Sequence, residues 1–109
     1  MTPAVLHILM VLANDARHGY GIMQEVEALS GGRVRLGPGT LDRSLQELRE
    51  QGWIEEREAE DDADPRRRTY RLSRRGRTAL RAELDRLAAL VDVARARDLL
   101  RRPGAEGSA

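Results

Sequence analysis

The stretch that decides the fold is LGPGTLDRSLQELREQG, residues 36–52. Within it Leu41, Leu45 and Leu48 recur at intervals of four and three residues, which places them along one side of a helix. Gly52 suits the end of that helix, because the chain commonly turns left-handed at such a position. The stretch therefore predicts a short helix with one apolar and one polar side.

The N-terminus and the polar side of this helix carry groups suited to DNA recognition. Pro38 fits the first turn, where a missing N–H costs nothing. Gly39 and Thr40 stand at an open helix N-terminus, whose free N–H groups can hold a phosphate. Arg43 and Gln46 lie about one turn apart on the outer side, and arginine suits guanine as glutamine suits adenine. We interpret this helix as a DNA recognition helix.

The composition limits what the rest of the chain can be. A chain of 109 residues is sufficient for one compact domain. Cysteine is absent, which excludes disulfides and thiolate metal sites and fits the reducing cytoplasm, where we expect the protein. We see no apolar run of membrane-spanning length and no basic flank of a secretory signal. Every basic side chain is arginine, which fits phosphate recognition and a GC-rich coding bias equally well.

Residues 4–13 predict an N-terminal helix that is apolar on almost every side, with Thr2 as its cap. A small domain cannot cover all of such a helix, so we expect a second subunit to cover part of it, with Leu6 and Leu9 at the contact. His7 is the one polar interruption. We interpret it as a packed or interface histidine, since a metal site needs several convergent ligands.

A second helix is predicted to begin at the HGYG motif of residues 18–21 and to end before the glycines at 31–32. Tyr20 at its start has two equally good interpretations. Its hydroxyl contacts a DNA phosphate, or its ring packs under the helix with only the tip in water. Residues 34–36 then predict a short extended piece or strand leading into the recognition helix.

Beyond the recognition helix the pattern predicts a hairpin, or wing, made of a strand at 53–58, an acidic loop at 58–64 and an alternating strand at 69–72. Trp53 is interpreted as an anchor beneath this hairpin rather than as a ligand-stacking residue, because a lone aromatic side chain is normally part of a core.

Charge is divided unequally within the wing. The outgoing strand and loop are acidic, whereas the returning strand and the start of the next helix carry only basic charge, at Arg66, Arg67, Arg68, Arg71, Arg74, Arg75, Arg77 and Arg81. These arginines either form a phosphate-binding stripe or pair with the acidic residues beside them. With the recognition helix next to them we favour the stripe, and we assign Arg66, Arg67, Arg68 and Tyr70 to the DNA surface.

Ser73 is the predicted cap of a long last helix that runs to about Arg101. Apolar residues recur along it at intervals of four and three, as in a helix that packs along another helix, at Leu80, Leu84, Leu87, Val91 and Ala94. At about 40 Å this helix outreaches the domain before it. We therefore expect residues 1–72 to bind DNA, residues 73–102 to dimerise with a second subunit, and residues 103–109 to be a disordered tail.

The predicted order of elements is that of a winged helix-turn-helix fold, mainly α with a small β-wing, followed by a dimerisation helix. With this order, the chain resembles the PadR family of bacterial transcriptional regulators over about residues 4–100, and its single last helix resembles the shorter PadR subfamily. The resemblance is carried by HGYG at 18–21, GPGTL at 37–41, Leu48 through the GWI of 52–54, and RTYRLS at 68–73 before Gly76-Arg77.

This resemblance implies a homodimer that binds a pseudo-palindromic operator on double-stranded DNA, usually as a repressor released by a small-molecule effector. In the family such an effector tends to lie between the N-terminal and C-terminal helices at the dimer interface. The chain departs from the family at Asp42, where tyrosine is typical, and at Arg43, where proline is frequent. An aspartate facing DNA would repel phosphate, although it can accept a hydrogen bond from cytosine.

Two other functions were weighed. A winged-helix module that binds protein instead of DNA would explain the acidic loop and Asp42. An enzyme is not expected, because no nucleophile has a nearby base and no metal-ligand cluster or phosphate loop is present. The glycines of residues 37–39 lack the following lysine of a nucleotide-binding loop. We expect no cofactor and no metal.

Overall fold

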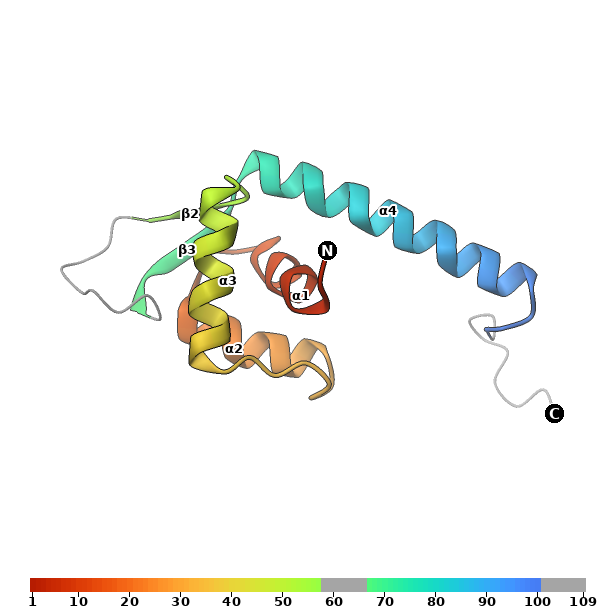
Figure 1. Ribbon diagram of the computed structural model, residues 1–109, viewed down its shortest axis with the longest axis horizontal. Helices are drawn as coiled ribbons and strands as arrows, with labels where there is room; N and C mark the ends of the chain where they lie inside the picture. Colours follow the sequence, from red (N-terminus) through yellow and green to blue (C-terminus); the bar gives the residue numbers. More distant parts are fainter. Residues whose placement is uncertain (58–66, 101–109) are drawn as a thin grey trace.

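In the part of the chain that the computed structural model describes, residues 1–57 and 67–100, three helices pack around a core beside a small sheet, and a fourth helix projects outward (Figure 1). The elements are α1 (Pro3–Leu12), β1 (Arg17–His18), α2 (Gly19–Leu29), α3 (Pro38–Glu50), β2 (Ile54–Glu56), β3 (Thr69–Leu72) and α4 (Arg74–Ala96). The winged helix-turn-helix fold expected from the sequence is confirmed. The predicted acidic loop at 58–64, Arg66 and the tail at 103–109 lie outside the described residues.

The predicted helix boundaries are confirmed where a local signal exists. Thr2 caps α1, with its hydroxyl accepting a hydrogen bond from the backbone N–H of Val5 at 3.2 Å. Ser73 caps α4 in the same way, accepting from the N–H of Gly76 at 2.9 Å. Gly52 follows α3 with φ of +75°, the left-handed conformation that glycine adopts most readily.

The sheet is antiparallel with strand order β1-β3-β2, and β2 and β3 form the base of the wing. Its third strand was not predicted. Arg17 and His18 pair with Tyr70 and Thr69 of β3. The predicted strand at 34–36 is absent, because the backbone N–H of Val34 bonds to the Ser30 hydroxyl at 2.9 Å rather than to another strand.

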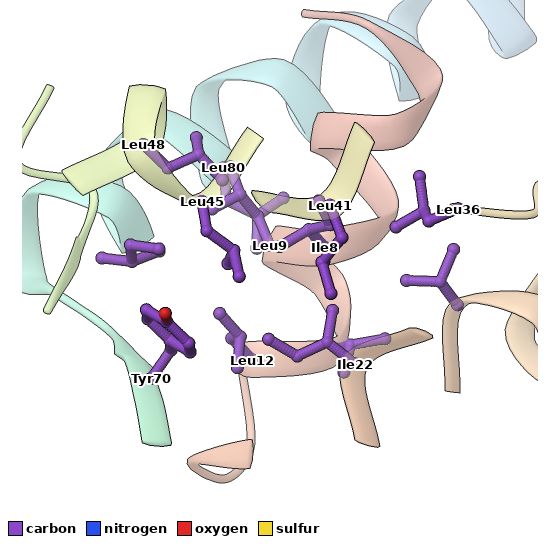
Figure 2. Close-up of a cluster of buried hydrophobic side chains, with 13 residues drawn as sticks. Ile8, Leu9, Leu12, Ile22, Leu36, Leu41, Leu45, Leu48, Tyr70 and Leu80 are labelled. Atoms are coloured by element: carbon purple, nitrogen blue, oxygen red, sulfur yellow. The ribbon is translucent and has the colours of Figure 1, made fainter. Parts of the chain in front are cut away.

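The core lies where α1, α2 and α3 meet the sheet (Figure 2). The three leucines of α3 that the sequence places on one side are all buried in it. Leu9 and Leu80 are buried there too, which corrects their expected place at a dimer contact, since both already pack within their own protomer. Trp53 packs against this core at the start of the hairpin, as the sequence predicts.

Helix α4 leaves the domain soon after its first turns, and Figure 1 shows it projecting well beyond the other helices. Its last residue is Ala96, not Arg101 as expected. The N–H of Leu99 bonds to the carbonyl of Ala94 at 2.9 Å, while Asp98 adopts a φ of +58°. The chain therefore reverses at a non-glycine residue, for which the sequence carries no signal.

Candidate nucleic-acid interface

Helix α3 presents two different sides, as the sequence predicts. Its leucines are buried, whereas Gly39, Thr40, Arg43 and Gln46 are exposed. Gly37 stands at the N-cap and makes no side-chain capping bond, so the first N–H groups of the helix have no side-chain acceptor from this cap. The exposed side of α3 thus combines an open N-terminus with two side chains able to read base edges.

The two predicted base-reading side chains differ in how they are held. Gln46 donates a hydrogen bond from its amide to the Glu50 carboxylate at 3.3 Å, one turn further along α3. Arg43 has no ion pair among the described residues 1–57 and 67–100. A guanidinium without a carboxylate partner can approach a guanine edge without first breaking an ion pair. Arg43 is therefore the better placed of the two for base recognition.

The structure corrects the expected place of Asp42 on the outer side of α3. Asp42 is half-buried, and its Oδ1 atom is covered and accepts no hydrogen bond. Its negative charge raises the pKa of the Tyr70 phenol in β3, so the Asp42 carboxylate lies close enough to the hairpin to act on that group. At about 100° per residue Asp42 lies on the flank of Arg49, with Gln46 one turn further on and Arg43 about 100° away around the helix.

The predicted place of Tyr70 on the DNA surface is also wrong. It is fully buried in the core, so it cannot contact DNA in this structure (Figure 2). Burial raises the pKa of its phenol, and the nearby Glu56 carboxylate raises this pKa further, whereas Arg49 and Arg68 lower it. Side chains alternate in direction along β3, and Tyr70 points into the core whereas Arg71 points to solvent. The alternating pattern in the sequence does not say which of the two sides faces inward.

Ion pairs occupy part of the predicted phosphate-binding stripe. Glu56 pairs with Arg68 at 3.0 Å, and Glu55 pairs with Arg71 at 2.7 Å across β2 and β3. Arg77 donates instead to the carbonyl of Ala13 at 2.7 Å, which ties α4 to the end of α1. The alternative weighed from the sequence, pairing with neighbouring acids, therefore holds for Arg68 and Arg71.

An open depression of about 680 Å³ lies between the start of α2 and the base of the wing. Its lining includes Tyr20, which is 46% exposed, together with Arg17, Arg57 and Arg67. The exposure of Tyr20 favours the first of its two interpretations, a contact with phosphate. Arg17 and Arg57 were not expected here. The pairing of β1 with β3 brings Arg17 to this surface, and a bond from the N–H of Arg57 to the carbonyl of Thr69 places Arg57 beside it; Arg17 is held by Glu25 at 2.6 Å.

A second surface is apolar and lies along α1, the end of α2 and α4. A shallow groove is lined by Leu6, His7, Met10, Leu29 and Leu84. The ring of His7 is fixed by a contact of 2.6 Å between Nδ1 and the Pro3 carbonyl oxygen.

Further along α4, Leu90, Val91 and Val93 are exposed, whereas Leu87 and Ala94 are half-buried. Of the predicted dimer contacts, Leu6, Leu84, Leu87, Val91 and Ala94 thus remain accessible at least in part.

Other classes of site are not evident in the described residues. Searched over 1–57 and 67–100, histidine and carboxylate side chains form no cluster of three that could hold a metal ion. Over the same residues, no helix combines the length and the apolarity needed to cross a membrane.

Comparisons with known proteins agree with this arrangement. A family model described as the transcriptional regulator PadR-like family matches residues 8–82, more than half of the chain. A transcriptional regulator from Clostridium thermocellum superposes with a TM-score of 0.69 at 20% identity, over 84% of this chain and 86% of that one. RosR of H. salinarum superposes with a TM-score of 0.66 at 26% identity, over 92% and 96%.

The Bacillus subtilis PadR protein, whose structure is a complex with operator DNA, superposes with a TM-score of 0.62 at 21% identity. The match covers 73% of this chain and 45% of that protein, so the chain spans less than half of its length. No curated protein sequence matches the chain significantly.

Proposed function

The chain belongs to the PadR-like family of transcriptional regulators, and we propose that it binds double-stranded DNA as a homodimer, with α3 in the major groove. The observation that carries this proposal is the two-sided character of α3. Its leucines fix it on the core, while Gly39, Thr40, Arg43 and Gln46 are exposed together. The operator complex of the B. subtilis protein, which has the same fold, supports it.

Each part of the exposed surface has a proposed role. Thr40 and the N–H groups at Gly39 hold a phosphate at the start of α3. Arg43 reads a guanine and Gln46 an adenine on the exposed side. Tyr20 contacts the backbone, and Arg67 lies along the minor groove or its phosphates.

Homodimerisation is proposed from the apolar surface of α4. Its exposed side chains Leu84, Leu90, Val91 and Val93 have no core of their own protomer to enter. A second copy that places α4 against the groove beside Leu6 would bury them. Two recognition helices related by a two-fold axis then read half-sites about one duplex turn apart, roughly 34–36 Å.

Repression in the cytoplasm, relieved by a small molecule, is the mode of action we propose. The apolar groove between α1 and α4 is the place for such an effector, because it lies at the proposed contact between subunits. An effector bound there changes DNA affinity by favouring one spacing of the two recognition helices.

Enrichment of duplexes from a random pool by the purified chain tests the proposal. The expected result is a pseudo-palindromic sequence with half-sites about one turn apart. A pool without any enriched sequence would refute it and favour a winged-helix module that binds protein.

A further inference from the structure

A carboxylate between the recognition helix and the wing joins two arginines. Glu56 of β2 accepts a hydrogen bond from Arg49 of α3 at 2.8 Å through one oxygen, and its other oxygen forms an ion pair with Nε of Arg68 on the returning arm, 3.0 Å away but not aligned as a hydrogen bond. The side chains of Glu56 and Arg68 are only 20% and 24% exposed. We call Arg49, Glu56 and Arg68 the Glu56 bridge.

The Glu56 bridge lies where it can fix the orientation of the hairpin arms relative to α3. Glu56 is the last residue of β2 and stands opposite Tyr70 of β3. Directly after it the N–H of Arg57 bonds to the carbonyl of Thr69 at 2.8 Å, which extends the pairing of the two arms by one residue. The bridge therefore joins α3 to both arms of the hairpin at the last paired residues.

Partly buried charges in this arrangement constrain geometry more than they add stability. Taking charges out of water is costly, and their attraction offsets this cost only when the geometry is good. Removing one partner leaves a covered charge without its counter-charge, and the remaining side chains must move toward water. Through Arg49 and Arg68, Glu56 thus ties the base of the hairpin to α3.

We propose that Glu56 is a positioning residue for DNA binding: its carboxylate fixes the spacing between α3 and the wing, so that both meet one duplex together. This inference rests on the proposed DNA-binding function. Electrostatics alone predicts that removing a negative charge beside DNA raises affinity. The proposal predicts the opposite for Glu56, whose removal should lower affinity.

The preceding residue provides a matched control. Glu55 carries the same charge on the same strand, but it pairs with Arg71 at the surface, where the two side chains are 50% and 56% exposed. Among the described residues it makes no hydrogen bond or ion pair with α3. Glu55→Gln therefore removes the same charge and leaves the bridge intact.

The test compares the wild-type protein, Glu56→Gln and Glu55→Gln on a duplex enriched by the wild-type protein from a random pool. We expect Glu55→Gln to bind as tightly as the wild type or more tightly, and Glu56→Gln to bind about tenfold more weakly. Hydroxyl-radical cleavage should show that Glu56→Gln loses protection of the minor groove beside each half-site and keeps that of the major groove. A general loss of structure would weaken both kinds of protection alike.

A second variant decides the matter if Glu56→Gln does not fold. Arg68→Lys keeps every charge but replaces the guanidinium whose Nε lies beside Glu56 with an ammonium on a flexible stem, so it should also weaken binding and minor-groove protection. The inference would be overturned, and the proposed function left standing, if Glu56→Gln or Arg68→Lys bound as tightly as Glu55→Gln and gave the wild-type cleavage pattern. A wild-type chain that enriches no duplex would overturn the proposed function together with it.

Discussion

Gly76→Ala tests how α4 is joined to the DNA-binding part of the fold. A Cβ atom built on Gly76 would lie 2.0 Å from the carbonyl oxygen of Trp53 and 2.8 Å from Cδ1 of Leu72. The oxygen belongs to the backbone and cannot turn aside as a side chain could. The start of α4 must therefore move away from Trp53 by about 1 Å to reach a tolerable contact.

That movement strains the bonds that fix the start of α4. The N–H of Ser73 bonds to the same Trp53 oxygen at 3.0 Å, and the Ser73 hydroxyl donates to the carbonyl of Gly52 at 2.6 Å. Overpacking costs about 1–3 kcal/mol, and each weakened hydrogen bond costs about 0.5–1.5 kcal/mol. The better helix propensity of alanine returns about 1 kcal/mol. With both bonds weakened, we expect the free energy of unfolding to fall by about 1–5 kcal/mol.

Urea unfolding followed by circular dichroism, at a fixed protein concentration, measures this change. Gly39→Ala is the matched control, because it lies in a helix and a Cβ there meets nothing within 4 Å. It should leave stability unchanged or raise it by up to about 1 kcal/mol. Gly76→Ala that is as stable as Gly39→Ala would refute the packing of α4 on Trp53.

Other predictions concern the dimer, the core and the wing. Leu90→Glu should convert dimers to folded monomers in sedimentation, because Leu90 is 53% exposed and supports no core of its own protomer; persistent dimers would exclude this face. Since the pKa of Tyr70 is raised, its stabilising effect is complete below about pH 10 and is lost as pH rises through the folded-state pKa. Tyr70→Phe should therefore unfold less steeply in alkali, and an unchanged profile would contradict this. Arg67→Ala should reduce the salt slope of DNA affinity by about one, whereas an unchanged slope would remove Arg67 from the phosphate contact.

The sequence was sufficient where a structural choice depends on neighbouring residues. The apolar spacing of α3, the caps at Thr2 and Ser73 and the left-handed Gly52 are local features, and each is confirmed. Such signals act within a few residues of one another, so they are visible in a linear pattern.

The sequence does not predict features that depend on contacts between distant segments. The strand β1 has only two residues, too few for an alternating pattern, and exists because it pairs with β3 more than fifty residues later. Tyr70, which stands opposite Arg17 in that pairing, is buried in the core.

The charge pattern of the wing was compatible with two arrangements. Arginines on one strand opposite glutamates on the next can pair with each other or remain available to phosphate. Only the register of β2 with β3 decides between them, by placing Glu55 opposite Arg71.

Base reading by α3 is tested most directly by the affinity of the wild-type protein and of Arg43→Ala for two duplexes, the enriched sequence and a scrambled one. Arg43→Ala should lose about 1–3 kcal/mol of binding free energy on the enriched duplex and almost none on the scrambled one. Equal weakening on both duplexes, or no weakening on either, would contradict the claim that α3 reads bases in the major groove.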